Sequence, residues 1–135
     1  MKVLVDTSVW SLVLRRPKRV DDATTGGLLE LIQEGRVVLL GAVRQELLSG
    51  IKAKAQFELL RDRLRAFPDL ELEPQDYEEA AAAFNQCRGR GIQGSNTDFL
   101  ICAVALRRDL AIYTTDGDFR QYARVLHLEL HQTQA

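Results

Sequence analysis

The chain alternates between short apolar runs and longer stretches in which apolar residues recur every three or four positions. The short runs are rich in β-branched residues and predict buried strands, whereas the longer stretches predict helices. The expected strands cover residues 2–5, 37–40, 70–72, 111–114 and 126–130. Because strands and helices alternate, we expect a three-layer α/β/α sandwich around a central parallel sheet of four or five strands.

Helix boundaries follow from capping residues and from proline and glycine breaks. Thr7 or Ser8 can cap the first helix, and Asn96 can cap the helix after the loop GIQGSN. That later helix contains the segment FLICAVAL, which is apolar on every side and predicts a buried central helix. The expected helices cover residues 7–15, 21–34, 43–48, 53–66, 74–89, 96–108 and 118–125.

The composition is that of one ordinary globular domain. The chain has 135 residues, of which 46% are hydrophobic and 27% are charged. A single domain spanning residues 1–135 can therefore bury its own core. Cys87 and Cys102 lie in predicted helices without the close spacing of zinc or redox motifs, so we expect reduced, buried thiols.

The charge of the chain is close to balanced. A formal net charge of -1 gives the protein no overall attraction for nucleic acid. Any RNA would have to bind at local basic clusters, each of which is otherwise ordinary solvated charge. The candidate clusters are Arg15, Arg16, Lys18 and Arg19, then Lys52 and Lys54, and finally Arg88 and Arg90.

No feature of the sequence predicts export or membrane insertion. Asp6 interrupts what would be the apolar core of a signal peptide. The longest unbroken apolar run covers residues 99–106, far fewer than the ~18 residues expected of a membrane span. We therefore expect a cytoplasmic protein that does not associate with membranes.

Acidic residues in distinct local settings carry the candidate chemistry. Asp6 and Asp116 each close a short strand, and the ligands of parallel sheets gather beyond the carboxyl ends of strands. If the first strand and the 111–114 strand are neighbours, these two carboxylates flank one crevice. Asp98 can join them from the first turn of its helix, and Glu46 must reach in from its own helix.

Electrostatic repulsion indicates what such a crevice would hold. Two carboxylates about 4 Å apart repel by about 4 kcal/mol at an effective dielectric constant of about 20. A divalent cation relieves this repulsion, and an all-oxygen ligand set favours Mg²⁺ or Mn²⁺ over zinc. Such an ion can promote phosphodiester hydrolysis without a protein nucleophile. The histidines, His127 and His131, lie away from every acidic motif, which disfavours a histidine-based nuclease.

Each acidic residue also has a simpler structural explanation. Asp6 could simply cap a helix, and Asp98 could simply interact favourably with a helix dipole, with no role in chemistry for either. Glu46 could be an ordinary surface residue, and Asp116 could belong only to a turn. The segment HLELH, residues 127–131, has the alternation of a terminal strand rather than the spacing of a zinc-binding helix.

With these motifs in their order and spacing, nearly the whole chain resembles the PIN-domain ribonucleases, and most closely the VapC-type toxins of toxin–antitoxin pairs. VLVDTSVW is similar to the family's first strand and metal-binding Asp, and VRQELLSG to its helix with a Glu. TDFLICAVA is similar to its central helix, and TTDGDF to its closing motif. The resemblance implies that the catalytic, metal-binding residues are Asp6, Glu46, Asp98 and Asp116, with Thr7 and Asp118 in support. Thr115, whose hydroxyl could bond to a carboxylate or to the scissile phosphate, and Asn96, first a helix cap, are further supporting candidates.

The same resemblance implies a function and a set of partners. It implies a Mg²⁺- or Mn²⁺-dependent endoribonuclease that cleaves RNA and arrests translation. A cognate VapB-type antitoxin would hold the enzyme inactive, and the chain would form a homodimer.

Other protein classes fit the sequence less well. A haloacid-dehalogenase-type phosphatase needs a second Asp two positions after Asp6, where this chain has Ser8. A dinucleotide-binding domain needs a glycine-rich first turn, which VDTSVW does not provide. Two alternatives remain open: a PIN-like module that binds RNA or protein without cleaving it, and a PIN nuclease of RNA maturation.

Overall fold

Seven helices and three short strands make up the part of the chain that the computed structural model describes, residues 1–15 and 23–132. The strands are β1 (Val3–Val5), β2 (Val37–Val38) and β3 (Ala111–Tyr113). The helices are α1 (Thr7–Arg15), α2 (Ala23–Gln33), α3 (Gly41–Leu48), α4 (Lys54–Leu64), α5 (Pro74–Gly89), α6 (Asn96–Arg108) and α7 (Asp118–Leu126). The predicted helices are thus confirmed to within a few residues; the predicted start of the second one lies outside the described residues.

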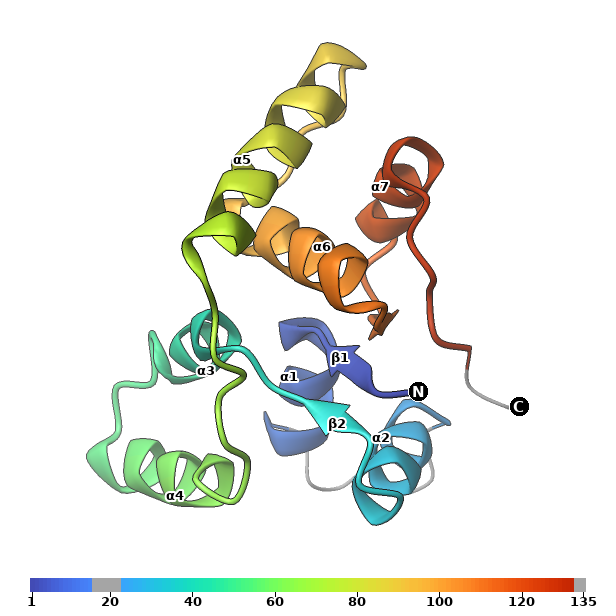
Figure 1. The fold of residues 1–135 in the computed structure, drawn as a ribbon. Coiled ribbons are helices and arrows are strands. Elements are labelled where there is room, and N and C mark those ends of the chain that lie inside the picture. Colours follow the sequence, from blue (N-terminus) through green and yellow to red (C-terminus); the bar gives the residue numbers. More distant parts are fainter. Residues whose placement is uncertain (16–22, 133–135) are drawn as a thin grey trace.

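The strands form a small parallel sheet in the order β2-β1-β3. β1 lies in the middle, and its residue Val5 pairs with Tyr113 of β3. Figure 1 shows α5, α6 and α7 gathered above the strands, and α2 and α4 below them. The expectation that the first strand and the 111–114 strand are neighbours is confirmed. The carboxyl ends of both strands therefore open at the same edge of the sheet.

The predicted sheet of four or five strands does not form in the described residues. The predicted strand over 70–72 does not form: one bridge, between Leu39 and Asp69, lies just before it, and Pro74 starts α5 almost at once. The prediction of a strand over 126–130 is also wrong. Helix α7 continues to Leu126, and only one bridge follows, between Ile112 and Leu130. The turn out of α7 uses His127 in the left-handed conformation (φ 58°), which breaks the extended run that HLELH suggested.

The central helix α6 is buried as its apolar sequence predicts. Every residue of 99–105 is buried, and one end of the helix carries Asp98. Cys87 and Cys102 are buried, free thiols, as expected. Trp10 of α1 is also buried in the core and contacts Phe67 edge to face, with ring centroids 5.1 Å apart. A continuous core thus fixes the helix that presents Asp98.

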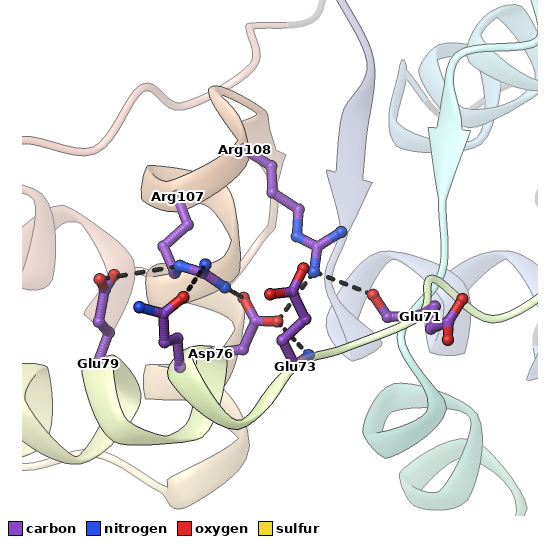
Figure 2. A network of polar contacts seen from close by, with 7 residues as sticks. Glu71, Glu73, Asp76, Glu79, Arg107 and Arg108 are labelled. Atoms are coloured by element: carbon purple, nitrogen blue, oxygen red, sulfur yellow. Dashed lines mark hydrogen bonds and ion pairs between the residues drawn. The ribbon is translucent and has the colours of Figure 1, made fainter.

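A buried carboxylate joins the start of α5 to the end of α6. Asp76 is 0% exposed and accepts hydrogen bonds from Arg107 Nη1 at 2.7 Å and from Arg108 Nη2 at 2.9 Å. It also accepts the backbone N–H of Glu73 at 2.8 Å, and Arg108 donates to the carbonyl of Glu71 (Figure 2). Burial acts to raise the pKa of Asp76, but these bonds outweigh it and hold the pKa below its usual value.

The candidate RNA-binding clusters are only partly visible. Arg16, Lys18, Arg19 and the side chain of Arg15 lie outside the described residues. The remaining basic residues, Lys52, Lys54, Arg88 and Arg90, are exposed. None of the described helices is long and apolar enough to cross a lipid bilayer.

Candidate active site

Asp6 lies directly after β1, at the edge of the sheet where β3 also ends. It is only 4% exposed, and its backbone N–H donates to the carbonyl of Tyr113 at 2.9 Å. Its own carbonyl accepts from Val9 and Trp10 in the first turn of α1. The strand-to-helix junction therefore holds a carboxylate in the interior, at the end of the sheet.

Two hydroxyl groups hold the carboxylate of Asp6 and connect two chain segments. Ser8 Oγ and Thr114 Oγ1 each donate to Asp6 Oδ2 at 2.8 Å. Ser8 Oγ also accepts the N–H of Thr115, and Thr114 Oγ1 accepts the N–H of Asp116, both at 3.0 Å. Because each hydroxyl uses its proton on Asp6 and a lone pair on a backbone amide, Asp6 joins the start of α1 to the loop after β3.

Asp98 occupies the first turn of α6. Ser95, and not the predicted Asn96, caps this helix: its Oγ accepts the N–H of Asp98 at 3.0 Å. Asn96 is instead the first helical residue and is exposed. The carboxylate of Asp98 accepts a hydrogen bond from Tyr122 Oη at 2.8 Å on Oδ2. Both the backbone and the side chain of Asp98 are thus held in place.

Asp116 and Asp118 lie on the turn that leads into α7. Asp116 Oδ1 accepts the N–H of Asp118 at 2.9 Å, so one carboxylate oxygen stabilises the turn. The side chain of Asp118 is exposed and lies in the first turn of α7. Thr115 is also exposed, and the threonine hydroxyl that bonds to Asp6 belongs to Thr114.

Glu46 lies on α3 and is exposed. Thr7 Oγ1 donates to Glu46 Oε1 at 2.6 Å, which ties α3 to the start of α1. Both residues line an open surface hollow of about 520 Å³, together with Thr97, the residue before Asp98. The hollow connects the Glu46 side of the site to the start of α6. Its lining residues are Thr7, Ala42, Gln45, Glu46, Ser49 and Thr97.

Negative charge accumulates at this end of the sheet. Burial raises the pKa of Asp6, although the bonds from Thr114 and Ser8 partly offset the effect. Burial also raises the pKa of Asp98, and the charges of Asp6 and Asp116 raise it further against the opposing Tyr122 bond. Within residues 1–15 and 23–132, no Lys, Arg or His forms an ion pair with any of these three carboxylates.

The four acidic residues do not converge on a single point. In the described part of the chain, no group of three or more His, Cys, Asp or Glu side chains is arranged to hold a metal ion. The donor chemistry nevertheless fits a hard divalent cation, because the oxygens are carboxylate and hydroxyl groups and no Lys, Arg or His among the described residues pairs with the carboxylates of Asp6 and Asp98. Asp6 supplies a buried carboxylate, Asp98 and Asp116 are half-buried, and Glu46 is exposed.

Sequence reasoning missed the residues that hold the carboxylates. Ser8 and Thr114 were detectable in principle, since one follows Asp6 by two positions and the other ends a predicted strand. Ser95 could be taken for the helix cap as readily as Asn96. Tyr122 gives no signal, because 24 residues separate it from Asp98 and only the fold brings them together.

Sequence comparison finds bacterial relatives of nearly the same length. Ribonuclease VapC11 of Mycobacterium tuberculosis (strain ATCC 25618 / H37Rv) is 27% identical over 130 residues, covering 94% of this chain and 96% of that protein. VapC ribonuclease Mb1587 of Mycobacterium bovis has the same identity and coverage.

Structural comparison finds the same fold in solved complexes. FitAcB from Neisseria gonorrhoeae is similar with a TM-score of 0.75 and 23% identity, covering 96% of both chains. VapBC2 from Rickettsia felis, bound to a DNA fragment from its promoter, is similar with a TM-score of 0.77 and 18% identity, covering 99% of this chain and 100% of that chain. A family model described as PIN domain matches residues 3–125, and the chain therefore belongs to the PIN domain family.

Proposed function

We propose that this protein is a Mg²⁺- or Mn²⁺-dependent endoribonuclease, the toxin of a VapBC-type toxin–antitoxin pair that inhibits translation. The observation that carries the proposal is the buried carboxylate of Asp6, without a cationic partner in the described chain, at the sheet edge that also carries Asp116. Membership of the PIN family and the VapC ribonuclease relatives support the same reaction class.

A divalent ion would be held by Asp6, Asp98 and Asp116, with Glu46 acting directly or through water. When bound, the ion would polarise the scissile phosphate and make a water molecule more acidic. The donor set supports Mg²⁺ or Mn²⁺ because it contains no thiolate or imidazole.

The chain's own residues orient this set. Ser8 and Thr114 both bond to Oδ2 of Asp6 and prevent that carboxylate from rotating. Glu46 is held through Oε1 by Thr7 and is exposed to solvent, and it would orient an attacking water for in-line displacement. Thr7 is thus a supporting residue. Asp118 could supply a further ligand from the first turn of α7, and Thr115 and Asn96 could contact RNA from exposed positions.

The direct test is RNA cleavage with control of the metal ion. We expect purified protein to cut total RNA with Mg²⁺ or Mn²⁺, and we expect EDTA to stop the reaction. Asp98→Asn should lose most of the activity because it removes a charge that the ion requires. Full activity in EDTA or in Asp98→Asn would exclude the metal-dependent mechanism.

The alternatives give different results in this assay. A PIN-like module without catalytic activity would bind RNA or protein but release no fragments under any metal condition. A nuclease of RNA maturation would cut one precursor and leave mature RNAs intact. A toxin would stop growth when its gene is expressed alone, and a co-expressed neighbouring gene would restore growth.

The proposed partner is a VapB-type antitoxin. The solved FitAcB and VapBC2 structures support this assignment, since their names describe such assemblies. A groove of about 700 Å³ between α1 and α4 offers a surface for a partner segment, with apolar Leu14 and Leu59 beside Lys52 and Arg63. Because translation is the proposed target, the cytoplasm is the proposed location.

We also propose that the chain forms a homodimer through the hollow between α5 and α6. This hollow, of about 440 Å³, is mostly apolar, and Tyr77 on its wall is 57% exposed. Tyr77→Glu should convert a dimer to a monomer, because a charge in an apolar interface must be desolvated. Leu29→Glu, an exposed apolar position on α2, is the control. Light scattering that finds a monomeric wild type, or a dimeric Tyr77→Glu variant, would exclude this interface.

A further inference from the structure

We propose that Tyr122 is a positioning residue that fixes the carboxylate of Asp98 for binding the divalent ion. This inference rests on the proposed metal-dependent function. It assigns a role to a side chain on α7 that lies 24 residues from Asp98 in the sequence. Tyr122 Oη donates to Asp98 Oδ2 at 2.8 Å, and the other carboxylate oxygen is not involved in that bond.

The ring of Tyr122 is held rigidly. The residue is 0% exposed, and its ring packs against Phe99 and Phe119 with centroid distances of 4.9 and 5.1 Å. Phe99 itself contacts Phe84 of α5 edge to face at 5.4 Å. Because aromatic rings in a close-packed core have little freedom to move, the hydroxyl group has a fixed position relative to α6.

The loop before α6 confines the hydroxyl group from another side. A Cβ atom at Gly94 would lie 2.3 Å from Tyr122 Oη and 2.8 Å from its Cζ. Only glycine therefore allows the loop to pass this close to the tyrosine. The hydroxyl is enclosed between the Gly94 backbone and the carboxylate of Asp98, so its proton is directed at Oδ2.

The hydrogen bond from Tyr122 fixes the χ2 torsion of Asp98, which the helix backbone leaves free. The backbone of Asp98 is set by α6 and by the Ser95 cap. The carboxylate of an aspartate can still rotate about χ2, which has a broad, roughly two-fold profile. A hydrogen bond from a rigid donor selects one orientation and leaves the second oxygen directed away from the tyrosine. Such partners behind a metal ligand raise its effective affinity.

The simpler role for Tyr122 is packing, with a hydroxyl that needs any acceptor. Tyr113 provides the matched comparison, because it is also buried and its hydroxyl donates to the backbone carbonyl of Thr24 at 2.9 Å. Tyr113→Phe therefore removes a buried tyrosine hydroxyl that bonds to a main-chain oxygen, whereas the hydroxyl of Tyr122 bonds to Asp98. A difference between the two Phe variants isolates the effect on Asp98.

The test measures Mn²⁺ binding by calorimetry on the full chain, beside RNA cleavage across a Mn²⁺ titration. We expect Tyr122→Phe to weaken Mn²⁺ binding by about 10-fold or more, as for other partners of metal ligands. Its cleavage should approach the wild-type rate at high Mn²⁺ concentration. Tyr113→Phe should bind Mn²⁺ like the wild type, even though both variants lose thermal stability.

A second variant perturbs the same contact from the other side. Gly94→Ala should displace the Tyr122 hydroxyl and weaken Mn²⁺ binding in the same way, whereas Gly26→Ala, which meets no atom within 4 Å, should not. Combining Gly94→Ala with Tyr122→Phe should add little further loss of affinity, because both act on one hydrogen bond.

Failure of the positioning role and failure of the proposed function give different experimental results. Unchanged Mn²⁺ affinity in Tyr122→Phe, or equal losses in Tyr122→Phe and Tyr113→Phe, would overturn the positioning role while leaving the nuclease assignment intact. A wild-type protein that neither binds Mn²⁺ nor cleaves RNA would overturn the proposed function, and the positioning role with it.

Discussion

Asp6→Asn is expected to abolish RNA cleavage while leaving the metal-free protein at least as stable as the wild type. Mutating even a residue that only supports a metal ligand costs about 10- to 100-fold in affinity or activity, so removing a proposed ligand itself should cost more than about 100-fold. Asparagine has nearly the same shape, and its Oδ1 can still accept the bonds from Ser8 and Thr114.

Asp6→Asn should lower activity but not stability, because the negative charge of Asp6 is unfavourable in the folded protein. Burial raises its pKa, which means that the folded state disfavours the ionised carboxylate. An amide removes that penalty. Thermal unfolding in EDTA, measured beside a cleavage assay, checks both halves of the prediction. Asp109→Asn is the control, since Asp109 is exposed and its left-handed conformation (φ 55°) also suits asparagine.

A large loss of thermal stability in Asp6→Asn would show that its carboxylate is structural. Retained cleavage would show that it is not a ligand. Either result would contradict the assignment of Asp6 as a functional residue for which the fold gives up stability.

Asp76→Asn is expected to have the largest effect on stability and little direct effect on the chemistry. Asp76 is fully buried and accepts charged hydrogen bonds from Arg107 and Arg108. Breaking a buried ion pair by removing one partner costs about 3 kcal/mol or more, which would lower Tm by about 10 °C in a domain of this size. The loss should separate the start of α5 from the end of α6 (Figure 2).

The pH dependence of this effect follows from the lowered pKa of Asp76. A carboxylate whose pKa is lower in the folded state stabilises the fold at pH values above its unfolded pKa, about 3.9. That contribution disappears as the pH falls through the folded pKa. The stability difference between wild type and Asp76→Asn should therefore be full near neutral pH and shrink below about pH 4.

Glu79→Gln is the matched control for the network. Glu79 is exposed and lies 3.8 Å from Arg107, a distance and setting at which an ion pair contributes little. Denaturant unfolding at several pH values should show a small, nearly constant effect for Glu79→Gln. Equal effects for both variants would mean that burial of Asp76 has no special role.

The sequence predicts the helices well because their signals are local. Pro74 at the start of α5 and the apolar run of α6 are properties of neighbouring residues. The same holds for the position of Asp6 after β1. Strand pairing is not local, which is why the 70–72 and 126–130 segments were wrongly expected to complete the sheet. Whether such a segment pairs depends on its neighbours in space.

The candidate site likewise combines residues that the sequence predicts with residues that only the fold reveals. The chain order reveals the acidic residues, and the fold places Asp6 and Asp98 near enough for their charges to interact. The residues that orient them, Thr114 and Tyr122, reach them from segments 108 and 24 residues away. No short-range pattern encodes those contacts, so they become visible only in three dimensions.

The central position of β1 in the sheet has a consequence for biosynthesis. β1 leaves the ribosome well before β3, which pairs with it, and before Thr114, which holds Asp6; both come more than a hundred residues later. A growing chain that ends before residue 114 lacks this hydroxyl and the carboxylate of Asp116. If Asp6 and Asp116 are the metal ligands proposed above, a nuclease built in this order would stay inactive until residues 114–116 have been made, and the message being translated would be protected from its product until then.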